Sequence, residues 1–259
     1  MKGVSLMRNL LFTMRYDGTD FHGWQVQNNA PTVQKAFQDA VEKITGKRDN
    51  IIGCSRTDAG VHANMYCCNM RTQSKIECSK FITALNAVMP KSIAVYDCRE
   101  VAFDFHARYD CISKQYVYKI WNAKERNPFL EKYYYHYKYP LDVDMLNEEA
   151  KAFLGKHDYS AFCSSGASTV DNVRTVEDVH LQRHGDEVLI YFQADGFLYN
   201  MVRIMTGTLI DISRGAIEKG TIAQIIDGKD RKRAGVTAPA HGLYLNKVNY
   251  EIMEDEHEK

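Results

Sequence analysis

The first hundred residues alternate between apolar segments of two different periods. Alternating or continuous apolar runs predict four strands, over 10–16, 50–54, 65–71 and 92–101. Apolar positions at helical spacing predict one helix over 33–45 and a second over 81–88 that ends before Pro90. This βαββαβ order is that of the ferredoxin-like unit, in which two helices pack on one face of an antiparallel sheet.

The rest of the chain repeats this order in a longer form. The pattern predicts four strands, over 115–121, 173–182, 187–194 and 243–250. It predicts three helices, over 143–154, 200–212 and 217–226. The two middle strands form a hairpin around the polar turn at 184–186. We therefore expect an α+β fold with two ferredoxin-like halves, residues 1–105 and 106–259, joined edge to edge into one extended antiparallel sheet with a central cleft.

Composition places the chain among globular proteins. It has 259 residues, of which 45% are hydrophobic and 25% charged, enough for a sizeable core. No apolar stretch approaches the length that spans a bilayer. The N-terminal residues do not resemble a signal peptide, because Arg15 and Asp17 interrupt the apolar residues that follow them. We expect a cytoplasmic location and no membrane partner.

Cysteine and histidine spacing gives no sign of a metal or a disulfide framework. The seven cysteines are an odd number and include no C-x-x-C pair, so reduced thiols are expected. His180 and His184 have the spacing of a helical zinc motif but lack the glutamate that follows the first histidine in it. Glycine-rich phosphate loops are also absent from the sequence. We predict no metal and no organic cofactor.

The net charge of zero conceals an uneven distribution. The stretch 114–138 is rich in lysine and interleaved with tyrosine, and Lys229 to Arg233 adds a second basic cluster. The tail from Glu254 to Glu258 carries compensating acidic residues. Aromatic and cationic side chains together suit RNA, where bases stack and phosphates attract cations. A solvated basic surface is the alternative for each cluster.

A lone carboxylate stands out between residues 51 and 63. Asp58 follows an apolar strand segment and lies between Arg56 and the turn at Gly60. A strand fixes the backbone before it, so the carboxylate is aimed rather than mobile, as a nucleophile requires. The alternative is that Asp58 caps a turn and pairs with Arg56 at the surface. These residues alone leave both interpretations open.

Several spaced motifs follow one another along nearly the whole chain. They are the segments Tyr16–Gln25, Arg56–Ala63, Asp104–Arg108, Lys114–Tyr118, Phe197–Arg203, Lys229–Arg231 and Thr237–Leu245. In this order they resemble the motifs of the tRNA pseudouridine synthase A family. The resemblance implies isomerisation of uridine to pseudouridine in the anticodon stem-loop of tRNAs, at about positions 38 to 40. It also implies a homodimer that acts on structured RNA without a cofactor.

The resemblance assigns roles to three residues. It makes Asp58 the nucleophile, and Arg203 matches the arginine that pairs with it. This pairing is expected to keep Asp58 ionised in a cleft where burial alone would raise its pKa. Tyr116 matches the tyrosine placed against the target uracil, where its hydroxyl can help to remove the C5 proton. How the carboxylate acts, on the sugar, on the base or by assisting a glycal route, stays open.

Four further residues are candidates for contacts with RNA. Arg56, two residues before Asp58, is expected on the same side of a strand, where it fills the space that the displaced uridine leaves. Gln25 and His62 are assigned to RNA contact or to local scaffolding, and Lys114 begins the basic stretch.

The sequence departs from the usual family pattern at two places. Ser55 stands where a glycine often precedes the arginine, and residues 65–70 replace a stretch that usually carries Gln-Val and Phe. Both flank Asp58, so an alternative is a paralogue that modifies ribosomal RNA. A noncatalytic RNA-binding protein on the same scaffold is a second alternative. A carboxylate-dependent hydrolase is a third, although no second carboxylate can be identified near Asp58.

Overall fold

The computed structural model describes residues 7–166 and 171–251 of the chain. The elements of its first part are β1 (Arg8–Tyr16), α1 (Val33–Thr45), β2 (Ile51–Gly53), β3 (His62–Thr72), α2 (Cys78–Val88) and β4 (Ile93–Val101). The strands and α-helices of its second part are β5 (Cys111–Trp121), β6 (Tyr135–His136), α3 (Val143–Ala150), β7 (Gly155–Asp158), β8 (Val173–His184), β9 (Glu187–Ala194), α4 (Met201–Ser213), α5 (Ile222–Gly228) and β10 (Leu243–Tyr250).

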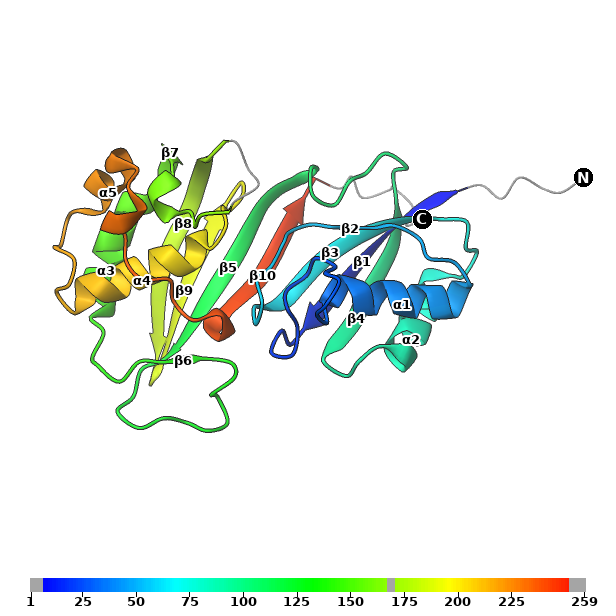
Figure 1. The fold of residues 1–259 in the computed structure, drawn as a ribbon, viewed down its shortest axis with the longest axis horizontal. Helices are drawn as coiled ribbons and strands as arrows, with labels where there is room; N and C mark the ends of the chain where they lie inside the picture. The colour runs from blue at the N-terminus through cyan, green and yellow to red at the C-terminus, as the bar shows by residue number, and fades with distance from the viewer. Residues whose placement is uncertain (1–6, 167–170, 252–259) are drawn as a thin grey trace, which may run out of the picture.

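The described strands form one sheet whose two parts have the same topology. The main path runs β4-β1-β3-β10-β5-β9-β8-β7, while β2 pairs with β3 and β6 with β5. In the first part, β4-β1-β3-β2 is the ferredoxin-like strand order, and β10-β5-β9-β8 repeats it in the second. The predicted α+β class with two joined ferredoxin-like units is confirmed. Helices of both units lie over the same face of the sheet (Figure 1).

The two units meet where β10 runs beside β3. Tyr244 pairs with His62 and Leu245 with Ala63, and the two strands are parallel at this point rather than antiparallel as predicted. Farther along the same edge of β3, β2 pairs with Cys68 to Met70. The chain between β2 and β3, residues 54–61, therefore leaves the sheet at the junction of the two units.

Each unit buries its helices against the sheet through apolar side chains. Phe12 of β1 contacts Phe37 of α1 and Phe81 of α2, with ring centroids 5.3 and 5.4 Å apart. In the second unit, α4 is buried along nearly its whole length. A Cβ on Gly207 of α4 would overlap the carbonyl oxygen of Val236, so the glycine lets these two backbones touch.

The predicted elements agree with the structure in type and differ at some ends. The helix over 33–45 is confirmed at both ends, whereas the helix predicted over 217–226 begins only at Ile222. Gly220, with φ of +75°, breaks the helical backbone conformation before Ile222. The helix predicted over 143–154 is α-helical to Ala150 and then tightens into a 3-10 turn. The short strands β6 and β7 were not predicted from the sequence.

Candidate active site

The loop that carries Asp58 is braced by the Tyr16–Gln25 segment. The Trp24 amide donates to the carbonyl oxygen of Thr57 over 3.1 Å, and the hydroxyls of Tyr16 and Thr57 are 2.8 Å apart. Gly23 has φ of +81°, and a Cβ there would overlap the Thr57 carbonyl oxygen. The first motif therefore fixes the backbone just before Asp58.

The geometry of this loop corrects one prediction. The strand before Asp58 ends at Gly53, so Arg56 and Asp58 lie in a loop and not on one side of a strand. Gly60 adopts φ of +77°, and the Val61 amide donates to the Asp58 carbonyl oxygen over 3.2 Å. A tight turn, rather than strand geometry, directs the Asp58 side chain.

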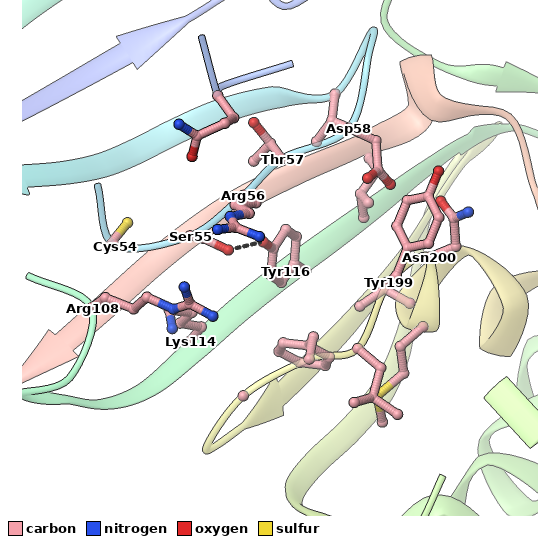
Figure 2. A pocket seen from close by; sticks show the side chains of 18 of the residues that line it. Cys54, Ser55, Arg56, Thr57, Asp58, Arg108, Lys114, Tyr116, Tyr199 and Asn200 are labelled. Atoms are coloured by element: carbon pink, nitrogen blue, oxygen red, sulfur yellow. Dashed lines mark hydrogen bonds between the residues drawn. The ribbon is translucent and has the colours of Figure 1, made fainter. Parts of the chain in front are cut away.

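A cleft of about 800 Å³ opens between the two units beside this loop. Figure 2 shows how loop and strand residues from both units line it. Of the predicted site residues, the cleft is lined by Gln25, Arg56, Asp58, Lys114 and Tyr116. The structure thus brings together side chains far apart in the sequence.

Asp58 and Arg203 form an ion pair across the junction of the two units. Arg203 Nη1 lies 3.4 Å from Asp58 Oδ2, and their side chains are 17% and 25% exposed. The same guanidinium donates through Nε to the Ala238 carbonyl oxygen over 2.7 Å and through Nη1 to Asn200 Oδ1 over 2.7 Å. Since these acceptors hold Arg203, its position does not depend on Asp58.

Asn200 is a further part of this arrangement. It caps the N-terminus of α4 with φ of +61°, a conformation that asparagine tolerates better than most residues. Its side-chain amide donates to Ser164 Oγ over 3.0 Å while its oxygen accepts from Arg203. Asn200 thereby links Arg203 to Ser164 through two hydrogen bonds.

The Asp58 carboxyl has a raised pKa. Burial raises the pKa, and the charge and hydrogen bond of Arg203 lower it without cancelling the rise. The long 3.4 Å contact and the two other acceptors of Arg203 explain why the pair does not outweigh burial. Arg203 was expected to offset the effect of burial on the pKa of Asp58, and it offsets only part of that effect.

Tyr116 is packed tightly in the same cleft. Its residue is 6% exposed, and its ring meets Phe197 edge to face with centroids 5.1 Å apart. The hydroxyl lies 3.1 Å from Ser55 Oγ. Burial raises the pKa of Tyr116 well above its usual value, so the phenol is neutral at physiological pH.

His62 has a scaffolding environment rather than an exposed one. It is 1% exposed, and the Gly18 amide donates to its Nδ1 over 3.0 Å. Its Nε2 lies 3.1 Å from the Lys132 carbonyl oxygen and 3.2 Å from that of His241. Since Nδ1 accepts, Nε2 carries the proton. Of the two interpretations of His62, the structure favours local scaffolding.

Replacing His62 by Gln is expected to weaken the pH dependence of stability. Burial lowers the pKa of His62 below 6.5, although Asp17 opposes this. The unfolded chain then binds more protons than the folded one between the lowered pKa and 6.5, so this stabilisation is present above pH 6.5 and is lost as pH falls. We expect the wild type to lose about 1 kcal/mol more than the variant between about pH 7.5 and 5.5. Urea unfolding at both pH values measures this, and equal losses would contradict it.

The basic stretch 114–138 does not form one surface. Lys114 and Lys119 are an odd number of positions apart on β5, so their side chains lie on opposite faces of the sheet. Lys114 lines the cleft, whereas the Lys119 ammonium lies 3.9 Å from the centroid of the Tyr244 ring. Only part of the predicted basic surface therefore faces the cleft.

The second basic cluster is partly committed to internal contacts. Lys229 pairs with Asp158 at 2.8 Å, and Arg231 donates to the Gly235 carbonyl oxygen and to Thr237 Oγ1. Lys232 and Arg233 are exposed. These contacts favour a structural role for the first two cations.

Comparison with known families gives this geometry a context. A family model described as tRNA pseudouridine synthase matches residues 13–110 and 150–251, which is most of the chain. The chain belongs to the tRNA pseudouridine synthase family. Asp58 and Arg203 lie within the matched ranges, whereas Tyr116 lies between them. The resemblance inferred from the motifs is confirmed.

Individual members of the tRNA pseudouridine synthase family are similar along the same length. The chain is 45% identical over 244 residues to tRNA pseudouridine synthase A of Thermoanaerobacter sp. (strain X514) and 46% identical to tRNA pseudouridine synthase A 2 of Clostridium perfringens (strain 13 / Type A). Each alignment covers 94% of this chain and the whole of the relative. Family membership makes the chain an isomerase.

Several residues that line the cleft were not predicted from the sequence. They are Arg108, Arg174, Phe197, Tyr199 and Asn200. All but Arg174 lie within the motifs that carried the resemblance. The sequence therefore pointed to these segments, but not to which of their side chains line the cleft. Arg174 is the second residue of β8, and no local sequence pattern marks it.

Two negative findings apply to the described part of the synthase. Residues 7–166 and 171–251 contain no group of three potential metal-ligating side chains. His180 Nδ1 instead lies 2.7 Å from Asp178, and its ring stacks on Tyr191. None of the helices in these ranges is long and apolar enough to cross a bilayer.

Proposed function

We propose that the chain isomerises uridine to pseudouridine in the anticodon stem-loop of tRNAs, at about positions 38 to 40, with Asp58 as the nucleophile. The observation that carries this proposal is the Asp58–Arg203 ion pair beside a cleft that Tyr116 also lines. The names of the similar proteins, tRNA pseudouridine synthase A, support tRNA as the substrate class.

The chemistry requires three events at one uridine. The C1′–N1 glycosidic bond breaks, the freed uracil turns, and a bond forms between C1′ and C5 before the C5 proton is lost. A carboxylate at Asp58 offers negative charge to the positive character that develops at C1′. Arg203 stabilises the charged form of Asp58, and the Tyr116 ring offers a flat surface for the detached base.

The proposal includes further contacts and an assembly. Arg56, Gln25 and Lys114 line the cleft. In this proposal Arg56 fills the space that the displaced uridine leaves, and Gln25 and Lys114 contact the RNA. Residues 1–105 supply the nucleophile and 106–259 complete the cleft. A homodimer in the cytoplasm that needs neither metal nor organic cofactor completes the proposal.

One of the two departures from the family pattern bears on the RNA target. Residues 65–70 lie in β3, are mostly buried and do not line the cleft. Ser55, by contrast, lines the cleft beside Tyr116. Ribosomal RNA is therefore an alternative target to be tested. A noncatalytic RNA-binding role would leave the Asp58–Arg203 pair without a purpose.

Pseudouridine mapping distinguishes the targets. Purified protein is incubated with unmodified transcripts of whole tRNAs and of ribosomal RNA fragments, and pseudouridine is located chemically at single-nucleotide resolution. We expect product in the tRNA anticodon arm. Product confined to ribosomal RNA would keep the chemistry and overturn the target, and binding without product would overturn the enzymatic proposal.

A further inference from the structure

We propose that Ser55 is a positioning residue that takes the hydroxyl proton of Tyr116 while Tyr116 accepts the C5 proton at the end of the reaction. This inference rests on the proposed function. It concerns a side chain that the family resemblance marks only as a departure, because a glycine is usual at this place.

The two hydroxyls are held together by independent parts of the fold. Ser55 Oγ lies 3.1 Å from the Tyr116 hydroxyl, as the dashed line in Figure 2 shows. The Tyr66 hydroxyl donates to the Ser55 carbonyl oxygen, which fixes the backbone of Ser55. Tyr116 is held by β5 and by the edge-to-face contact with Phe197. The pair is therefore in place before RNA binds.

Tyr116 needs such a partner if its hydroxyl is to act as a base. Burial raises the pKa of Tyr116, so a tyrosinate is not available at neutral pH. A neutral phenol accepts a proton readily only if its own proton leaves in the same step. Among the hydrogen bonds of the described residues, Ser55 Oγ is the partner of the Tyr116 hydroxyl.

Protons and electrons are conserved in this step. After C1′ is joined to C5, the C5–H bond breaks and its electron pair forms the C5–C6 double bond, while the C6–N1 double-bond pair moves to N1. The C5 proton goes to the Tyr116 oxygen, and the Tyr116 proton goes to Ser55 Oγ. The Ser55 proton passes to water in the cleft, and N1 takes a proton from water. No net proton is gained or lost.

A glycine at this position would leave the place of Ser55 Oγ open to water. Water is itself a proton acceptor and donor, so an enzyme with glycine can run the same step through solvent. In this chain Ser55 instead supplies a fixed hydroxyl, 3.1 Å from the Tyr116 hydroxyl. The benefit of a fixed group over a mobile water is one of orientation.

The test measures the rate and the primary isotope effect on tRNA transcripts that carry protium or deuterium at uridine C5. The variants are Ser55→Ala and Ser55→Gly, which remove the hydroxyl, and Ser55→Thr, which keeps it. Ser113→Ala is the matched control, because it removes a hydroxyl from β5, the strand of Tyr116, that accepts from Asn249 and does not contact Tyr116. Tyr116→Phe with and without Ser55→Ala completes a double-mutant cycle.

We expect Ser55→Ala and Ser55→Gly to lower kcat about tenfold, the scale of one lost hydrogen bond in a proton transfer, and to raise the isotope effect. Ser55→Thr is expected to keep most of the wild-type rate and isotope effect, and Ser113→Ala to leave the isotope effect unchanged. In the Tyr116→Phe background, Ser55→Ala should cost nothing further. An unchanged rate and isotope effect in both Ser55→Ala and Ser55→Gly, or an equal loss in the Tyr116→Phe background, would overturn the inference. Absence of product with the wild type would instead refute the proposed function.

Discussion

Replacing Asp58 by Asn is expected to lower the rate of pseudouridine formation by at least about 10⁴-fold, as removal of a nucleophile does in other enzymes. The amide has the shape of the carboxylate but neither its charge nor its nucleophilicity. Asp58 is partly exposed and its loop is held by Trp24 and Thr57, so the fold does not depend on the carboxylate. RNA binding should persist, because loss of a negative charge does not weaken attraction to phosphates.

Asp195→Asn provides the matched control for Asp58→Asn. Asp195 is an exposed carboxylate in the lining of the same cleft, and its Oδ1 accepts from the Thr175 amide over 3.0 Å. The substitution removes the same charge and keeps this acceptor. Nucleoside analysis after single-turnover incubation, with filter binding for affinity, compares the two variants. Equal activity of Asp58→Asn and Asp195→Asn would exclude Asp58 as the nucleophile.

Replacing Arg203 by Met is expected to move the acidic limb of activity toward higher pH. Burial already raises the pKa of Asp58, and Arg203 opposes that rise. Without the cation the pKa rises further, so a smaller fraction of Asp58 is ionised at any acidic pH. We expect the acidic limb of kcat/KM to shift up by about one pH unit. We expect the rate at neutral pH to fall about 10²-fold, since lost charge stabilisation also weakens the transition state.

The comparison with Arg203→Lys separates charge from shape. Lysine keeps the charge but cannot donate to Ala238, Asn200 and Asp58 at once as the guanidinium does. We expect its acidic limb to lie between those of the wild type and Arg203→Met. Profiles of kcat/KM from about pH 5 to 9 measure this, and an acidic limb that stays in place for Arg203→Met would contradict the role assigned to Arg203.

Much of the fold could be predicted from periodicity because its elements bury one face each. The pattern in 33–45 gave both ends of α1, and the alternation in 243–250 gave β10. β7, with the residues Gly155–Asp158, has no apolar alternation and was missed, since its pairing with β8 defines it. The parallel contact of β10 with β3 depends on how two units dock, which no local pattern reports.

The motifs indicated which residues to look for at the cleft, but not how they are arranged there. The motifs pointed to Asp58, Tyr116 and Arg203, and the structure places all three at the junction of the units. The balance of charge and burial at Asp58 was not predictable, because it depends on Arg203 also bonding to Ala238. The contact of Ser55 with Tyr116 joins residues 61 positions apart and needs the folded sheet.

The central claim, pseudouridine formation that depends on Asp58, is tested most directly by tritium release. A tRNA transcript labelled with tritium at uridine C5 is incubated with the wild type or with Asp58→Asn, in buffer that contains a chelator and no cofactor. We predict release of one tritium per uridine isomerised by the wild type and none by Asp58→Asn, although both bind the transcript. Equal release by the two proteins, or no release by a folded wild type that binds the transcript, would contradict the claim.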